Sequence, residues 1–254
     1  MIYLLLSAVC AWLGLSSGIG ATTLLRPLLD AVSPLEPTAT AMLCTVATLS
    51  AALVSAFFAL SKPLPLHRDE LILLAVGAFI GGILGDLISG RFFGILKQQN
   101  AVLLQNALLF TLIALPALYF SMLSRTIRPL AVTRLTSLPA ALIVGLLASF
   151  LAFGAVPLTL MLYYLLYDAE DDEAAAAALT ISLCAMIGKL LVLFIRSRMN
   201  LPNAELLLWL LPGALLGALA PMLPGMHLTG RRTGDTLLRL SLFTSLINMA
   251  ASFA

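Results

Sequence analysis

The stretch GLSSGIGATTLLRPLL, residues 14–29, places three glycines and a proline inside an apolar run. It belongs to an apolar segment at 2–31, which is longer than the roughly 20 residues that cross a bilayer as one straight helix. Glycine and proline both weaken or break helices. We therefore predict a broken helix or a re-entrant hairpin here, with the freed backbone groups inside the protein or beside water.

A second interruption lies in the apolar segment 137–167, where residues 148–166 read ASFLAFGAVPLTLMLYYLL. An offset of 136 residues aligns Gly18 with Gly154 and places the motif GAFIG, which starts at Gly77, on GALLG, which starts at Gly213. Repeated halves with interrupted helices in corresponding places indicate a transporter and its binding site. We predict a first repeat at 1–124, a basic connecting loop at 125–136 and a second repeat at 137–254.

The composition places the whole chain in a membrane. Of its 254 residues, 61% are hydrophobic and 10% are charged, whereas a soluble domain is about 25% charged. The net charge of +2, without a basic block, argues against a nucleic-acid partner. The expected fold is an all-α integral membrane protein with about eight transmembrane segments in two homologous four-helix halves. The segments lie near 2–31, 38–60, 70–95, 100–122, 137–167, 174–195, 203–225 and 235–253.

The two interrupted segments leave two topologies open. If every segment crosses once, the excess of Lys and Arg puts both termini in the cytoplasm, and the halves are parallel repeats. If the first and fifth segments are hairpins, each half crosses three times and the halves are inverted. The charge count does not exclude the second version, but we prefer eight crossings.

Both interrupted stretches, together with GAFIGGILGD at 77–86 and PGALLGALAP at 212–221, resemble the TauE/SafE family of sulfite exporters, also called the four-toluene-sulfonate uptake permease family. Gly18, Gly20 and Pro27 stand where the family pattern expects them. The second half departs further, since Gly154 alone remains of the glycine cluster and Tyr163 replaces the later proline. The resemblance implies a multi-pass transporter of the cell inner membrane that exports or takes up sulfite, organosulfonates or another small organic anion, without a cofactor.

The candidate anion site consists of the backbone at the two interruptions. A helix N-terminus presents unpaired N–H groups and the positive end of the helix dipole, and threonine hydroxyls add donors. The residues are Gly18, Gly20, Ala21, Thr22 and Thr23 in the first half, and Gly154, Ala155 and Thr159 in the second. The alternative is that the glycines serve only close helix packing.

Three charged residues fall inside apolar segments, where such residues usually mark a pathway or a pair. Lys189 is expected to bind the anion, or to extend along its stem toward the membrane surface. Asp86 could carry a coupling proton or ion, or form an ion pair with Lys189 or Arg91. Arg26 could gate the anion, but its spacing from Asp30 favours an i,i+4 ion pair.

Other functional classes find little support. Cys10, Cys44 and Cys184 are interpreted as buried small hydrophobes, and His67 and His227 as loop residues without a metal-ligand pattern. No hydrolase, metalloprotease or nucleotide-binding motif occurs, so an enzyme is not expected. Thr45, Thr180 and Ser182 line the path or bond back to their own helices, with the second more frequent. A carrier of a neutral metabolite, a non-transporting membrane partner and a homo-oligomer remain open.

Overall fold

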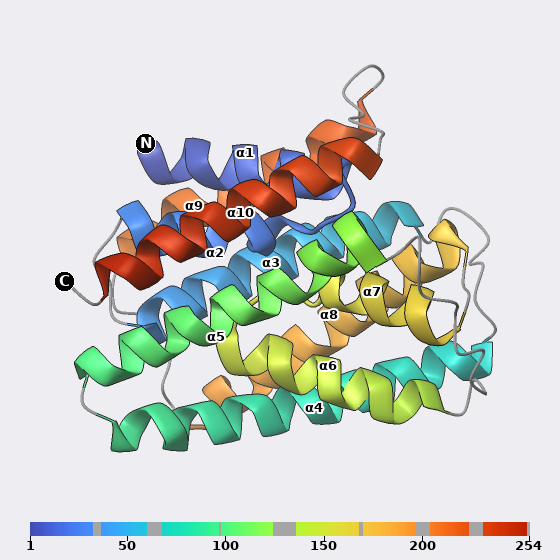
Figure 1. The fold of residues 1–254 in the computed structure, drawn as a ribbon, viewed down its shortest axis with the longest axis horizontal. Helices are drawn as coiled ribbons and strands as arrows, with labels where there is room; N and C mark the ends of the chain where they lie inside the picture. The colour runs from blue at the N-terminus through green and yellow to red at the C-terminus, as the bar shows by residue number, and fades with distance from the viewer. Residues whose placement is uncertain are drawn as a thin grey trace.

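The computed structural model describes residues 1–32, 37–59, 68–96, 98–123, 136–167, 170–196, 204–223 and 231–252, and these residues form helices and their connections (Figure 1). The α-helices are α1 (Ile2–Ser16), α2 (Ala21–Val32), α3 (Pro37–Ala59), α4 (Arg68–Ile95), α5 (Gln98–Leu118), α6 (Ser137–Leu151), α7 (Val156–Leu166), α8 (Asp171–Ile195), α9 (Ala204–Leu219) and α10 (Arg231–Ala251). A π-helix, η1 (Tyr119–Leu123), extends α5, and a 3₁₀ helix, η3 (Ala220–Met222), extends α9. The predicted all-helical class is confirmed for the described residues.

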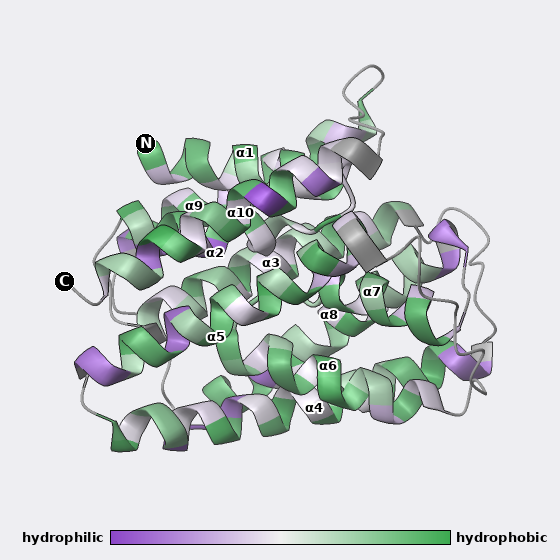
Figure 2. Cartoon of the chain, viewed as in Figure 1, coloured by the Kyte–Doolittle hydropathy of each residue, from purple (hydrophilic) through white to green (hydrophobic). Residues whose placement is uncertain are grey.

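Five of these helices are long and apolar enough to cross a membrane: α3, α4, α5, α8 and α9. Helix α10 has 21 residues, which is sufficient length, but Asp235 and Arg239 lower its apolar character. Apolar residues dominate the cartoon and polar residues gather near helix ends (Figure 2). Phe57, Leu208 and Phe243 are among many large apolar side chains on the outer surface. These features describe a multi-pass membrane protein, while the eight single crossings expected from the sequence are not confirmed.

The chain reverses direction at two short connections between helices. The first turn, residues 17–20, joins α1 to α2, and the second turn, residues 152–155, joins α6 to α7. At the second, the side-chain oxygens of Thr136 before α6 and Tyr167 after α7 lie 2.8 Å apart, so the two helices return to one end. At the first, α2 leads back toward the side where α1 begins (Figure 1).

Each helix before a turn packs along a long helix that lies far away in the sequence. A Cβ placed on Gly213 of α9 would meet Leu4 of α1, and one placed on Gly217 would meet Ala8. From the first contact to the second, the residue number rises by four in each helix, so α1 and α9 run parallel. Helices α6 and α4 run parallel in the same way, and Gly145 of α6 lies so close to Ala78 that a Cβ would be 2.7 Å from its carbonyl oxygen. Small residues permit this close approach of helix backbones in lipid.

Some sequence-based expectations concern residues outside the described ranges. They include most of the connecting loop predicted at 125–136 and both histidines. Of the acidic stretch at 168–173, Glu170 precedes α8 and Asp171 is its first residue.

Candidate functional site

The two turns meet inside the protein. A Cβ placed on Gly20 would lie 2.8 Å from Cγ2 of Val156, and one placed on Gly154 would overlap the Thr22 hydroxyl. The first residues of α2 therefore lie against the second turn and the first residue of α7. Gly18 and Gly20 have φ angles of 75° and 84°, values that glycine adopts without strain. Of these two glycines, Gly20 makes the close contact, because a Cβ on Gly18 would meet nothing within 4 Å.

A cavity of about 30 Å³ adjoins this contact. That volume exceeds the minimum that one water molecule needs. Its walls come from the end of α1, the turn that follows it, the starts of α2 and α7, and the middle of α3 and α8. The lining residues are Leu15, Gly20, Ala21, Thr22, Thr48, Ala51, Ala52, Val156, Leu179 and Ser182.

The hydroxyls around the turns divide into two groups. Thr23 donates to the Ile19 carbonyl at 2.6 Å, and Thr159 donates to the Ala155 carbonyl at 2.8 Å, so both predicted site residues bond within their own half. The hydroxyls of Thr22 and Ser182 are buried without a hydrogen-bond partner, and both residues line the cavity. Buried hydroxyls normally find a partner, so these two are candidates for ligand contacts.

Of the small polar residues that the sequence left ambiguous, Ser182 is the one that faces the cavity. Thr45 and Thr180 donate to the carbonyls four residues earlier, at 2.7 and 2.8 Å. Back-bonding of this kind satisfies the hydroxyl within its own helix.

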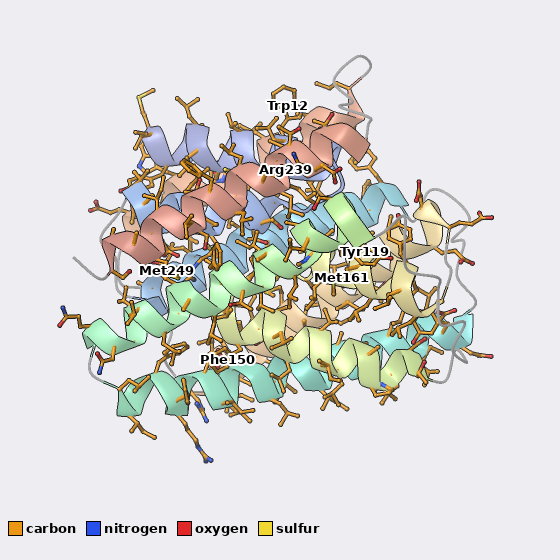
Figure 3. All side chains as sticks on the ribbon, viewed as in Figure 1. Trp12, Tyr119, Phe150, Met161, Arg239 and Met249 are labelled. Atoms are coloured by element: carbon orange, nitrogen blue, oxygen red, sulfur yellow. The ribbon has the colours of Figure 1, made fainter. Side chains whose placement is uncertain are left out.

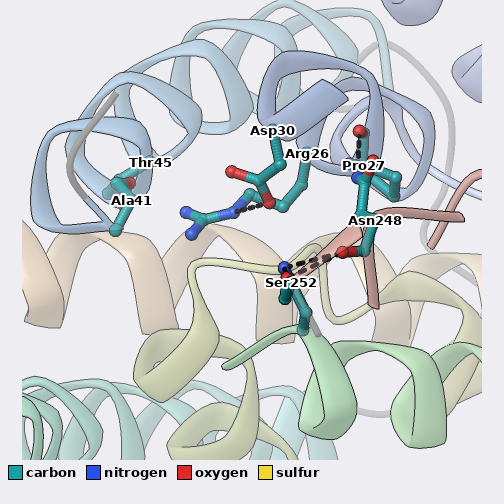
Figure 4. Close-up of polar contacts among 8 residues, drawn as sticks. Arg26, Pro27, Asp30, Ala41, Thr45, Asn248 and Ser252 are labelled. Atoms are coloured by element: carbon teal, nitrogen blue, oxygen red, sulfur yellow. Dashed lines mark hydrogen bonds and ion pairs between the residues drawn. The ribbon is translucent and has the colours of Figure 1, made fainter. Parts of the chain in front are cut away.

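Helix α10 holds α2 in place through two carbonyl groups. Pro27 has no N–H group, so the Thr23 carbonyl loses its usual partner within α2. The Ser241 hydroxyl donates to that carbonyl at 2.5 Å. Asn248 Nδ2 donates to the Pro27 carbonyl at 2.7 Å (Figure 4). Sequence reasoning did not single out Ser241 and Asn248. The signal was a proline in mid-helix, which calls for a donor from elsewhere.

Lys189 contacts the second helical hairpin, formed by α6 and α7, and does not line the cavity. Its Nζ donates to the carbonyl oxygen of Ser149, near the end of α6, and lies 3.5 Å from Asp86 Oδ1. The Lys189 and Asp86 side chains are 3% and 10% exposed, and Lys189 is not among the residues that line the cavity. The carbonyl end of a helix attracts a cation, so Lys189 stabilises the end of α6, just before the second turn.

Arg26 is fully buried in the middle of α2. Its Nε donates to Asp30 Oδ2 at 3.1 Å, which is the i,i+4 pair expected from their spacing. Nη1 and Nη2 are buried and have no hydrogen-bond partner. The guanidinium lies beside the thiol of Cys44 on α3 and within electrostatic range of Lys189. The sequence indicated the ion pair but not the two nitrogen atoms without a partner.

The described residues contain no group of three or more His, Cys, Asp and Glu side chains that could hold a metal ion. Cys10, Cys44 and Cys184 are free thiols, and the first two are buried. Another buried acid, Glu70 on α4, accepts hydrogen bonds from Ser137 at 3.4 Å and Tyr163 at 3.1 Å, at the base of the second hairpin. It was not predicted, because nothing in the sequence pairs Glu70 with residues 67 and 93 positions later.

Comparison with known families decides the class of this helical protein. The sequence matches the family described as sulfite exporter TauE/SafE over residues 3–253, nearly the whole chain. The chain belongs to the TauE/SafE family. Comparisons with curated proteins and with solved structures found no match. TauE/SafE membership makes the chain a membrane transporter of the sulfite exporter type and confirms the resemblance seen in its sequence.

Proposed function

We propose that this chain carries sulfite or a small organosulfonate across the cell inner membrane, and that the anion binds where the two turns meet. The observation that carries this proposal is the junction of the starts of α2 and α7 beside a cavity with two buried, unpartnered hydroxyls, those of Thr22 and Ser182. Family membership supports the sulfur oxyanion as the substrate class.

The start of a helix suits an anion because its first N–H groups have no partner within the helix and its dipole is positive there. Two such starts converge at this junction, from α2 and from α7. A sulfite ion or a sulfonate group has three oxygens that accept hydrogen bonds. Backbone N–H groups and the Thr22 and Ser182 hydroxyls would supply donors without a full charge at the cavity wall.

The two halves, 1–124 and 137–254, are proposed to be inverted repeats. Helix α1 packs on α9 as α6 packs on α4, and α2 packs on α10 as α7 packs on α5. Each of these four contacts thus has a counterpart with the roles of the halves exchanged. We assign α1–α2 and α6–α7 as re-entrant hairpins and three crossings to each half, in place of eight single crossings. Alternating access would then move one half against the other around the junction.

Asp86 is proposed to couple transport to a proton. Its carboxylate faces Lys189, and Lys189 holds the Ser149 carbonyl that precedes the second turn. Protonation of Asp86 would weaken this ion pair and loosen the hold on the turn. Sulfite uptake into proteoliposomes that is unchanged when the proton gradient is collapsed would contradict this coupling.

Two adjacent threonines provide a matched test of the anion site. Thr22 and Thr23 are both fully buried, but the Thr23 hydroxyl is already bonded to Ile19. The Thr22→Val substitution is expected to weaken sulfite binding roughly 5- to 30-fold, as the loss of one or two kcal/mol from a hydrogen bond to a charged ligand would do. The Thr23→Val variant should bind sulfite as the natural protein does.

Binding is measured with the purified, detergent-solubilised protein, by its thermal stabilisation across sulfite, sulfonates, sulfate and small carboxylates. Uptake of ³⁵S-sulfite into proteoliposomes then tests transport. The absence of stabilisation or uptake with any of these anions would contradict the proposed function. Equal loss of affinity in the two threonine variants would contradict the assigned site.

A further inference from the structure

The guanidinium of Arg26 is held at one edge and open at the other. Its Nε is fixed by Asp30 at 3.1 Å, one turn further along α2. The side chain is 0% exposed, and both Nη atoms are buried without a partner. Buried charged donors without a partner are strongly unfavourable, which makes this open edge the least satisfied charged group among the described residues.

Arg26 lies one helical turn from the cavity, on the face of α2 that carries Thr22. Helices α2 and α3 lie side by side, with Arg26 beside Cys44 and with Thr22 and Thr48 together at the cavity. Residues four apart on a helix have neighbouring side chains, about 5–6 Å from one another. The guanidinium points from α2 toward α3, on the side of Ala41 and Thr45 (Figure 4). The open edge of Arg26 therefore lies between α2 and α3, one helical turn from the cavity that Thr22 and Thr48 line.

Lys189 offers the contrast. It too is buried, but its ammonium group is occupied by the Ser149 carbonyl and by Asp86. Its ammonium group lies near Arg26 and adds positive potential there. Among the buried cations that the structure describes, Arg26 is thus the one with donor nitrogens that have no hydrogen-bond partner.

We propose that the open edge of Arg26 is the charged ligand of the transported oxyanion, which binds between α2 and α3 with two oxygens toward Nη1 and Nη2. The planar guanidinium fork matches two oxygens of an oxyanion, a geometry that a lysine ammonium does not reproduce. The role of Asp30 is to orient this fork. The inference rests on the proposed function and adds to it the residue that recognises the charge.

The test is equilibrium binding of ³⁵S-sulfite to the purified full chain under anaerobic conditions. The Arg26→Gln/Asp30→Asn pair removes the cation without leaving a buried unpaired acid, and it should bind sulfite roughly 10- to 100-fold more weakly. Arg26→Lys keeps the charge but not the fork, and it should lose part of the affinity and the preference for sulfite over chloride. Arg239→Gln, which removes one cation from the exposed face of α10, should leave binding unchanged (Figure 3).

Each result separates the inference from the proposed function. If the natural protein binds sulfite and both Arg26 variants bind it equally well, Arg26 is not a ligand, although the proposed function stands. If the natural protein binds no anion, the proposed function itself fails. A purely structural Arg26–Asp30 pair would lower the melting temperature without changing affinity or anion preference. If the double variant does not fold, the sulfite affinity and anion preference of Arg26→Lys provide the test.

Discussion

The two helical hairpins have a similar backbone but are held in different ways. In the first, Gly18 and Gly20 adopt positive φ angles, and α2 carries its own charges, Arg26 and Asp30. In the second, a non-glycine residue, Ala152, has a φ angle of 51°, and α7 contains no charged residue. The charged contacts of the second hairpin come from outside it, through Lys189 and Glu70.

The difference lies in how the charges are satisfied. The first hairpin carries a cation whose Nη1 and Nη2 have no hydrogen-bond partner, whereas the charges that contact the second hairpin have partners. The two hairpins therefore share a helix–turn–helix shape but differ in their chemistry. Four sets of substitutions are expected to distinguish how the two hairpins are held.

The largest effect is expected from Lys189→Met at the second hairpin. Removing one partner of a buried ion pair leaves the other charge uncompensated. In this variant the Asp86 carboxylate would lose the Lys189 ammonium group. We expect a loss of about 3–5 kcal/mol of unfolding free energy. The loss is measured by thermal unfolding in detergent. Adding Asp86→Leu should recover most of it, and a single variant as stable as the natural protein would contradict a bracing role for Lys189.

Next are the paired substitutions Gly20→Ala and Gly18→Ala at the first turn. Both introduce a side chain at a positive φ angle, which is unfavourable by about 1–2 kcal/mol. A Cβ at Gly20 also lies 2.8 Å from Val156, whereas one at Gly18 meets nothing within 4 Å. Gly20→Ala should therefore destabilise by about 1–3 kcal/mol more than Gly18→Ala. Adding Val156→Ala should remove most of that difference in melting experiments, and equal effects of the two glycine variants would argue against contact between the turns.

A smaller effect is expected from Ser241→Ala, which removes the donor to the Thr23 carbonyl. The unsatisfied carbonyl should lower stability by about 1–3 kcal/mol. Thr244→Ala on the same helix is the control, because its exposed hydroxyl bonds only to Leu240 of its own helix. In the Pro27→Ala background the restored N–H can reach the Thr23 carbonyl, so Ser241→Ala should then have little effect. Additive losses in the double variant would show that the proline does not create the need for Ser241.

The smallest effect is a gain. Ala152→Gly relieves the left-handed conformation at the second turn and should stabilise the protein by about 0.5–1 kcal/mol. Ala175→Gly, at an exposed position in α8, should destabilise by about 1 kcal/mol. The two melting-temperature changes are thus expected to have opposite signs. Destabilisation by Ala152→Gly would mean that the turn gains nothing from glycine.

Much of the architecture could be predicted from the sequence, because lipid imposes strong rules on composition. The positions of glycine and proline predicted where the apolar segments are interrupted, and the 136-residue offset aligned Gly18 with Gly154. In the structure Gly20 lies against Val156 and Gly154 lies against Thr22, whereas a Cβ on Gly18 would meet nothing within 4 Å. The preference for eight single crossings is not confirmed, because a hairpin and a crossing leave the same apolar signature in the chain.

The chemistry of the site was less predictable, since side-chain direction depends on helices that are distant in sequence. The sequence showed that Lys189 lies inside an apolar segment. Its orientation toward the Ser149 carbonyl, however, depends on how α8 packs against α6. The Thr22 and Thr23 hydroxyls looked equivalent until the structure showed which one is bonded. The contacts of α10 with α2 connect residues more than 200 positions apart.

The exchange of helices between the halves also bears on synthesis at the ribosome. Helix α6 meets a partner, α4, that already exists, but α1 packs along α9, which emerges roughly 200 residues later. At about 5–20 residues per second, the first helix made must wait some 10–40 seconds for its partner. A first half expressed alone would present the α1 face without α9, so the two halves should function only when they are produced together.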